Sequence, residues 1–228
     1  MKNELIQAKN VSRNYILKGE KIEALRNINL NINNGEFLTL VGRSGSGKTT
    51  LLNILAGLDE PSAGEILFKG NNINDYNEKE KISFRRFEIG VIFQSFSLLP
   101  LLSAYENIEL PMRICGINSK ERNKRTKGAL KMIGLEKRGN HRPYELSGGE
   151  QQRIAIARAI AMKPKLLLAD EPTGELDSVN AFSIFSLFKE IVNEQNMSII
   201  ATTHDRTLLD LSDKTLNISN GEIANHIT

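Results

Sequence analysis

The chain is organised around one short stretch, Gly42-Arg43-Ser44-Gly45-Ser46-Gly47-Lys48-Thr49, which matches the pattern G-x-x-x-x-G-K-[ST]. Glycines allow such a loop to wrap a polyphosphate and to point its backbone N–H groups inward. The apolar run at residues 37–41 predicts a buried strand before the loop, and residues 51–55 predict a short helix after it. This strand–loop–helix context is the one in which the pattern binds phosphate.

Two side chains at the end of this loop are suited to triphosphate chemistry. Lys48 is placed to neutralise charge on the β- and γ-phosphates, and the Thr49 hydroxyl can ligate Mg²⁺. We include Thr50, the next residue of the predicted helix, with the eight loop residues in the predicted phosphate-binding set.

A second buried strand is predicted at residues 166–169, and it ends in two adjacent carboxylates, Asp170 and Glu171. Asp170 is placed to hold Mg²⁺ through water, and Glu171 to orient and polarise an attacking water. A strand that ends in Asp-Glu is a weak signal alone, but together with the phosphate loop it indicates a hydrolytic site.

Three further side chains follow strand-like segments. His204 lies just beyond the predicted strand at residues 198–202, where a doubly wound sheet binds its ligands, and we interpret it as a γ-phosphate sensor. Gln94 follows an apolar run, and its amide could reach Mg²⁺ or the water. Tyr15 lies in an early strand region, where its ring could stack on a nucleotide base. The predicted catalytic residues are Glu171, His204 and Gln94, and the predicted metal-ligating residues are Thr49, Gln94 and Asp170.

A second phosphate-facing element is indicated by Leu146-Ser147-Gly148-Gly149-Glu150-Gln151-Gln152-Arg153, which opens a run with helical character. Small residues at a helix N-terminus expose backbone N–H groups at the positive end of the helix dipole, which suits a phosphate. One chain with two such elements indicates either two ligands or one ligand shared between chains.

Strands that alternate with helices predict an α/β fold with a mostly parallel sheet around the phosphate loop. Residues 28–32 alternate apolar and polar side chains and predict an antiparallel region near the N-terminus. The middle of the chain is mostly helical and charged. We therefore expect one domain over residues 1–228, with a core at 1–95 and 160–228 and an inserted helical subdomain at 96–159.

Composition excludes several functional classes. The net charge of +3 is too balanced to indicate nucleic-acid binding by itself, and we expect no nucleic-acid partner. No stretch approaches the roughly 18 to 20 apolar residues that cross a bilayer, and the N-terminus lacks the pattern of a secretion signal. We expect a cytoplasmic protein that reaches a membrane only through a partner.

The ordered set of motifs resembles the nucleotide-binding subunit of ABC transporters over essentially the whole chain. The set comprises Tyr15, the phosphate loop, Gln94, Leu146–Glu150, Asp170-Glu171, Gly174-Glu175-Leu176-Asp177 and His204. The resemblance implies ATP and Mg²⁺ as cofactors and an ATP-dependent homodimer that sandwiches two ATP molecules head to tail. It further implies that the signature residues of one chain, Ser147, Gly148, Gly149 and Glu150, face the nucleotide held by the other. Asp177 would lie in the loop that connects the two sites.

More narrowly, the phrases at residues 93–100, 106–111 and 168–174 look like one subgroup, as does Glu150 in place of a more usual Gln. This subgroup comprises the ATPases of lipoprotein-release, macrolide-export and antimicrobial-peptide-resistance systems, together with the cell-division ATPase FtsE. The resemblance implies a separate integral-membrane permease and export or extraction of a lipophilic or peptide substrate. Two other functions stay open: mechanical regulation of a membrane partner without transport, and a non-transport ABC ATPase.

Overall fold

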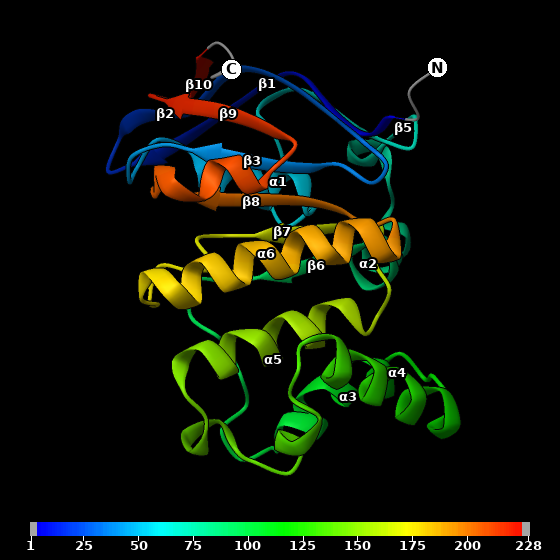
Figure 1. The fold of residues 1–228 in the computed structure, drawn as a ribbon. Helices are drawn as coiled ribbons and strands as arrows, with labels where there is room; N and C mark the ends of the chain where they lie inside the picture. The colour runs from blue at the N-terminus through cyan, green and yellow to red at the C-terminus, as the bar shows by residue number, and fades with distance from the viewer. Residues whose placement is uncertain (1–3, 225–228) are drawn as a thin grey trace.

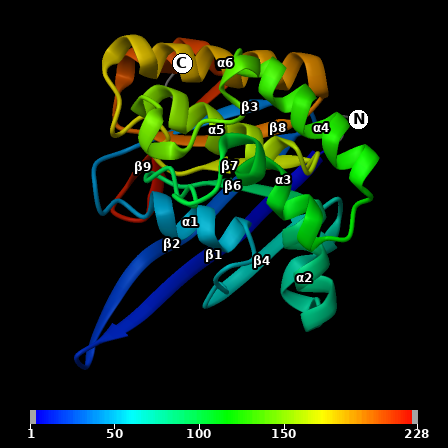
Figure 2. The ribbon, with the colours of Figure 1, turned by 90° about the horizontal axis from the view of Figure 1, so that it is seen from below.

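The antiparallel part of the fold is a four-stranded sheet near the N-terminus (Figure 1). The computed structural model describes residues 4–224. The strands follow the order β2-β1-β4-β5. Their bounds are β1 Glu4–Leu17, β2 Glu20–Asn33, β4 Ala63–Phe68 and β5 Asn71–Asn72. Ile28, Leu30 and Ile32 form the buried face of β2, which confirms the alternation predicted there. The tip of the β1–β2 hairpin projects beyond the body of the protein (Figure 2).

The second sheet has six strands in the order β10-β9-β3-β8-β7-β6. Every neighbouring pair is parallel except β9 with β10, so the predicted mostly parallel sheet is confirmed. Its strands are β3 Phe37–Val41, β6 Ile89–Ile92, β7 Leu166–Ala169, β8 Ser198–Thr203, β9 Lys214–Ser219 and β10 Glu222–Ala224.

The central strands of this sheet are buried on both faces. Leu38 and Leu40 of β3 point into the core shared with the antiparallel sheet, whereas Phe37 points into the core shared with the later helices. A strand that is covered on both faces reads as a continuous apolar run rather than as an alternating one. This is why β3 and β7 were recognisable from short apolar segments.

Helices cover both faces of the six-stranded sheet, and several begin at a polar capping side chain. Ser103, Asn118, Ser147 and Asp177 each accept a backbone N–H bond at a helix start, as capping residues do. The helices are α1 Lys48–Leu55, α2 Glu78–Phe87, α3 Ala104–Ile114, α4 Ser119–Met132, α5 Gly148–Ile160 and α6 Ser178–Gln195. Short 3-10 turns are at Ile73–Asp75, Glu136–Arg138, Pro143–Glu145 and Arg206–Leu211.

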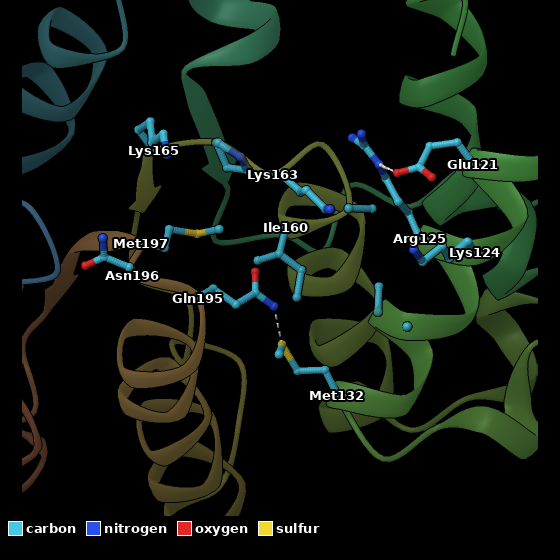
Figure 3. A pocket seen from close by; sticks show the side chains of 14 residues that line it. Glu121, Lys124, Arg125, Met132, Ile160, Lys163, Lys165, Gln195, Asn196 and Met197 are labelled. Atoms are coloured by element: carbon cyan, nitrogen blue, oxygen red, sulfur yellow. Dashed lines mark hydrogen bonds and ion pairs between the residues drawn. The ribbon is translucent and has the colours of Figure 1, made fainter. Parts of the chain in front are cut away.

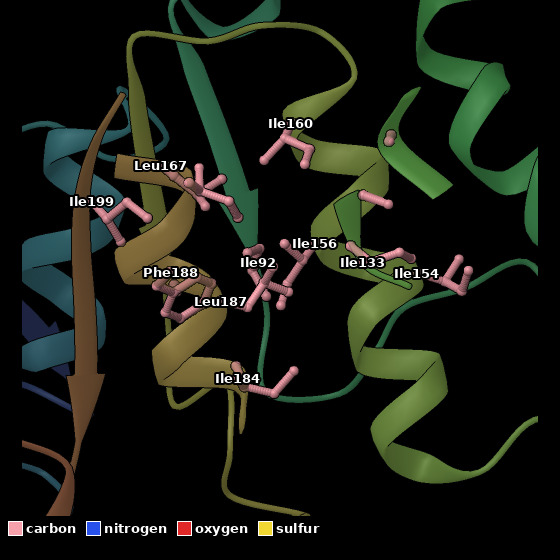
Figure 4. Packing of buried hydrophobic residues seen from close by; sticks show 14 of the residues in the cluster. Ile92, Ile133, Ile154, Ile156, Ile160, Leu167, Ile184, Leu187, Phe188 and Ile199 are labelled. Atoms are coloured by element: carbon pink, nitrogen blue, oxygen red, sulfur yellow. The ribbon is translucent and has the colours of Figure 1, made fainter. Parts of the chain in front are cut away.

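Helices α3, α4 and α5 are inserted between β6 and β7 and gather at one end of the molecule (Figure 1). Figure 4 shows how α5 joins them to the sheet: Ile156 and Ile160 pack toward Ile92 of β6, Leu167 of β7 and Phe188 of α6. The insert therefore shares one continuous hydrophobic core with the face of the sheet that α6 covers. Among the helices of residues 4–224, none combines the length and apolar character that a membrane crossing requires.

Candidate functional site

The phosphate loop links the carboxyl end of β3 to the start of α1, as the sequence predicted. Two of its glycines have no room for a side chain. A Cβ on Gly42 would lie 2.3 Å from the backbone oxygen of Ile218, and one on Gly47 would lie 2.6 Å from that of Ala24. Gly47 also has φ of 106°, in the region that favours glycine. The neighbouring strand β9 and the β2 backbone therefore force the loop to be glycine-rich.

Lys48 points back into the loop, and its side chain is only 4% exposed. The Nζ donates to the backbone oxygens of Gly42 at 2.8 Å and Arg43 at 3.1 Å. It also lies 3.3 Å from Oε1 of Glu171. A buried ammonium needs such compensation, and here loop carbonyls and one carboxylate supply it.

Asp170 is fixed by hydroxyl groups from two different elements. Thr49 Oγ1, at the start of α1, donates to Asp170 Oδ2 at 2.7 Å. Thr202 Oγ1, on β8, donates to Asp170 Oδ1 at 2.9 Å. Asp170 thus joins the phosphate loop to the neighbouring strand of the sheet.

Thr202 is a site residue that the sequence reasoning missed. It is fully buried, and its Oγ1 also accepts the backbone N–H of Glu171 at 2.7 Å. The parallel register, which pairs Ala169 with Ala201, places residue 202 directly beside the Asp170-Glu171 pair. A hydroxyl at the end of an apolar strand was the available signal.

Glu171 lies between two cationic or titratable side chains. One carboxylate oxygen faces Lys48, and Oε2 lies 3.5 Å from Nδ1 of His204, whose side chain is 65% exposed. The backbone of Glu171 has φ of 43°, a left-handed conformation that costs a non-glycine residue about 1 kcal/mol. A cavity of about 160 Å³ opens beside Glu171 and His204. The predicted phosphate-binding residue Lys48 and the predicted catalytic residues Glu171 and His204 therefore meet at the carboxyl ends of β3, β7 and β8.

Gln94 and Tyr15 lie outside the hydrogen bonds of this cluster. The exposed Gln94 packs against the loop after Glu171, because a Cβ on Gly174 would lie 3.2 Å from Gln94 Nε2. The Tyr15 hydroxyl donates to Asp59 Oδ2 at 2.6 Å, and the guanidinium of Arg13 lies 4.6 Å from the ring centroid. Their predicted roles toward Mg²⁺ and a base remain predictions.

The turn at Ser147–Glu150 is a complete capping box at the start of α5. The Glu150 N–H donates to Ser147 Oγ at 3.3 Å, and the Ser147 N–H donates to Glu150 Oε2 at 2.9 Å. Arg138 Nε donates to the other oxygen of Glu150 at 3.0 Å. The backbone bond from Ser147 holds the pKa of Glu150 below its ordinary value. The pattern S-x-x-E could have indicated this capping role from sequence.

Asp177 is joined to this turn through Asn180, which the sequence reasoning also missed. Asp177 accepts the Asn180 N–H at 2.9 Å and its Nδ2 at 2.7 Å. A Cβ on Gly149 would lie 2.6 Å from Asn180 Oδ1, so the two helix starts are in close contact.

The site residues thus form two groups. The loop cluster comprises Lys48, Thr49, Asp170, Glu171, Thr202 and His204. The signature cluster comprises Ser147, Gly148, Gly149, Glu150, Asp177 and Asn180. Within residues 4–224, no hydrogen bond or ion pair connects one cluster to the other.

The oxygen pair of the loop cluster suits a small, hard cation. Thr49 Oγ1 and Asp170 Oδ2 are neutral and anionic oxygen ligands of the kind that Mg²⁺ takes, with its remaining positions filled by water and substrate phosphates. The described part of the chain contains no group of three or more His, Cys, Asp or Glu residues arranged to hold a metal. The residues therefore fit a magnesium ion that arrives with a phosphate ligand, and not a site made entirely of protein side chains.

A glycine-rich loop between a parallel strand and a helix, with an adjacent strand that ends in carboxylates, defines the P-loop class of nucleotide-binding domains. A family model described as "ABC transporter" matches residues 25–174. The chain belongs to the ABC transporter family, and its domain is an ATPase domain of that family.

Relatives match this chain over nearly its full length. The uncharacterised ABC transporter ATP-binding protein MJ1508 of Methanocaldococcus jannaschii is 48% identical over 96% of this chain and 97% of that protein. The lipoprotein-releasing system ATP-binding protein LolD of Aquifex aeolicus is 43% identical over 99% of this chain and 98% of that protein. A solved structure, the dimeric post-hydrolysis state of the ATP-binding cassette MJ0796 bound to ADP and Pi, matches with a TM-score of 0.87 at 41% identity, covering 97% of each chain.

Proposed function

We propose that this chain binds and hydrolyses ATP at sites shared by two copies and so drives a separate membrane permease. One observation carries the proposal. The loop cluster and the signature cluster both present groups suited to a phosphate, yet no hydrogen bond or ion pair within residues 4–224 connects them. A second copy, packed head to tail, would bring its signature cluster to the open side of this chain's loop cluster. The solved relative MJ0796, which is dimeric and bound to ADP and Pi, supports this arrangement.

Residues of the loop cluster and its surroundings have proposed roles toward the nucleotide. The N–H groups of residues 42–47, with Thr50, hold the phosphates, and Lys48 neutralises their charge. Thr49 and Asp170 hold Mg²⁺, with Gln94 as a further ligand, and the ion would supply charge neutralisation on the β- and γ-phosphate oxygens. Tyr15 stacks on the adenine at the edge of the site.

Glu171 is proposed to activate the attacking water. In the structure its carboxylate faces Lys48 and His204 rather than open solvent alone. A γ-phosphate near Lys48 competes for the ammonium, which frees Glu171 Oε1 to accept a hydrogen bond from water. His204, on the other side of Glu171, is placed to contact the γ-phosphate, so it positions the phosphate against the water.

Domain motion and location follow from the same proposal. We propose residues 96–159 as the helical unit that moves relative to a core at 1–95 and 160–228, with Gln94 at its root. The permease would hold the chain at the cytoplasmic face of the membrane. Relatives named for lipoprotein release support export or extraction of a lipophilic or peptide substrate by the complete system.

The experiment compares Glu171→Gln with Glu190→Gln, an exposed carboxylate on α6 outside both clusters. Loss of a general base lowers turnover by about 10²- to 10⁴-fold, so we expect Glu171→Gln to bind ATP, hydrolyse it very slowly and accumulate as a dimer. Glu190→Gln is expected to keep the wild-type rate. A normal ATPase rate in Glu171→Gln would remove Glu171 from this role. Membrane proteins that co-purify with the trapped dimer would identify the permease.

A further inference from the structure

A pocket of about 560 Å³ lies between α4 and the carboxyl ends of α5 and α6 (Figure 3). This volume is in the range of pockets that bind small organic ligands. Lys165 and Met197, which line it, immediately precede β7 and β8. The pocket is therefore at the opposite edge of the sheet from the loop cluster, which lies at the carboxyl ends of the same strands.

The floor of the pocket is apolar, and it joins the inserted helices to the core. Its apolar lining residues are Ala129, Met132, Ile160, Ala161, Pro164 and Met197. The Nε2 of Gln195, at the end of α6, donates to the Met132 sulfur at 3.0 Å, and Figure 3 shows this contact. A ligand on this floor would touch α4 and the end of α6 together.

The rim carries an excess of positive charge. Arg125 Nε donates to Glu121 Oε1 at 2.7 Å and holds the pKa of that carboxyl below its ordinary value, so these two charges compensate each other. Lys124, Lys163 and Lys165 form no ion pair with any residue from 4 to 224. The carboxyl ends of α5 and α6 contribute roughly half a negative charge each, so together they neutralise about one of the three lysine charges. About two positive charges remain for a ligand.

Gly128 keeps the pocket open. It stands inside α4, where glycine is less favourable than alanine, and it lines the pocket. A Cβ built on Gly128 meets no atom within 4 Å, and its φ is not in the left-handed region. Neither the packing of the protein nor its backbone conformation therefore requires glycine here, and its missing side chain leaves space in the pocket for an occupant.

We propose that this pocket binds a small amphipathic anion, a single apolar chain with a phosphate or carboxylate head. The apolar chain lies on the floor, and the positive charge of Lys124, Lys163 and Lys165 at the rim attracts the head. Because the ligand contacts both α4 and the core, its binding restrains the inserted helices and changes ATP turnover. The effect on turnover rests on the proposed function, but the binding itself does not.

The test uses octyl phosphate as the probe, with inorganic phosphate and octanol as its two halves. We expect saturable one-site binding of octyl phosphate by calorimetry. Octanol, which lacks the charged head, and inorganic phosphate, which lacks the apolar chain, should each bind at least about tenfold more weakly. Absence of saturable octyl phosphate binding would overturn the proposal. Equal binding of inorganic phosphate would overturn the amphipathic assignment.

Matched variants locate the binding. Lys163→Gln with Lys165→Gln is expected to weaken octyl phosphate about tenfold or more, whereas Lys127→Gln with Lys131→Gln, exposed lysines outside the pocket, leaves it unchanged. Gly128→Leu is expected to abolish binding by filling the pocket, and Gly128→Ala to weaken it less. Both are expected to keep at least the wild-type melting temperature, because they add a better helix former. Unchanged binding in a folded Gly128→Leu protein would contradict the assignment to this pocket.

A vesicle experiment distinguishes a membrane lipid from a soluble amphiphile as the source of the anion. Co-sedimentation with vesicles of acidic phospholipid that requires Lys163 and Lys165 would assign a membrane lipid. Binding of octyl phosphate without such co-sedimentation would assign a soluble amphiphile. Failure of both would overturn the site, while the Glu171→Gln measurement would be unaffected.

Discussion

Glu171 combines an unfavourable backbone conformation with two electrostatic contacts. Its φ of 43° is held by the N–H bond to Thr202, and its carboxylate lies between Lys48 and His204. Strained backbones of this kind cluster at active sites, where surrounding structure determines them. The Thr202 hydroxyl thus holds both members of the Asp170-Glu171 pair, one through its side chain and the other through its backbone N–H.

Thr202→Val tests this support. The substitution leaves the partly buried N–H of Glu171 without its acceptor, so we expect a loss of about 1 kcal/mol in the free energy of unfolding and a lower ATPase rate. Thr39→Val is the matched control: Thr39 is also fully buried, and in the described structure its hydroxyl has no hydrogen-bond partner. Urea unfolding should show Thr39→Val unchanged or more stable. Equal destabilisation by the two substitutions would contradict the role of Thr202.

Glu150 makes the capping box sensitive to pH. Its folded-state pKa is below the ordinary value of 4.5, so its stabilising contribution is complete above that pH and is lost as the pH falls through the folded-state pKa. We expect Glu150→Gln to be less stable than wild type at about pH 7 and the difference to shrink toward about pH 3. Urea unfolding at both values measures it. A stability difference that grows in acid would contradict this sign.

Site residues differed in how far sequence could find them. Lys48, Thr49, Asp170 and Glu171 follow from two local motifs, each placed by its own strand. Thr202 and Asn180 do not, because their importance arises from contacts between strands or helices far apart in the chain. Local sequence patterns identify the residues that contact a ligand better than they identify the residues that position those side chains.

At the scale of elements, the starts of α5 and α6 form one unit. Gly149 and Asn180 are in contact, and Asn180 in turn is bonded twice to Asp177. The Ser147–Glu150 turn of the inserted helices and the Asp177 turn of the core are therefore in direct contact. The contact between Gly149 and Asn180 and the hydrogen bonds from Asn180 to Asp177 connect the two turns, through which we propose that the two shared sites communicate.

Gly149→Ala should break this contact. The added Cβ displaces the Asn180 amide and its 2.7 Å bond to Asp177, so we expect the unfolding free energy of Gly149→Ala to be about 1 kcal/mol below that of Gly148→Ala, which adds the same helix former. Gly148→Ala is the control, since its nearest neighbours would lie 3.6 Å away. In an Asn180→Ala background the effect of Gly149→Ala should disappear, because the obstructing amide is gone. Persistence of the full effect there would place its cause elsewhere.

Elements with strong periodicity were predictable, and their mutual placement was not. The phosphate loop and the apolar strands followed from turn residues and from runs of apolar residues. The order β10-β9-β3-β8-β7-β6 did not, since strands distant in sequence are neighbours in this sheet. The pattern S-x-x-E at residues 147–150 is a local signal for the capping box at the start of α5, and the same residues belong to the signature cluster.

The whole molecule presents two half-sites, and the proposal requires a second copy to complete each one. A chain with only its own loop cluster should bind ATP but hydrolyse it poorly. The separation of the two clusters then becomes a means of coupling ATP to association. Two triphosphates bridging two copies would supply the roughly 5 kcal/mol that shifts such an equilibrium from mostly open to mostly closed.

Ser147→Arg tests this at the signature cluster. A large cation in place of the serine should block a partner's phosphate, so we expect ATP binding at Lys48 to persist while dimer closure and turnover are lost. Ser147→Ala removes the same hydroxyl cap, at about 1 kcal/mol of stability, without adding a bulky cation, and is therefore the control for folding. Nucleotide binding, light scattering and ATPase rate measure the three properties.

The most direct measurement is the ATPase rate of an equimolar mixture of Lys48→Ala and Ser147→Arg chains. Each variant alone should be inactive, since both sites of its homodimer contain the defect. In a mixed dimer one site combines the intact Lys48 of one copy with the intact Ser147 of the other, so activity should return on mixing. A mixture as inactive as its components, or a Ser147→Arg chain that hydrolyses ATP normally alone, would contradict the shared site.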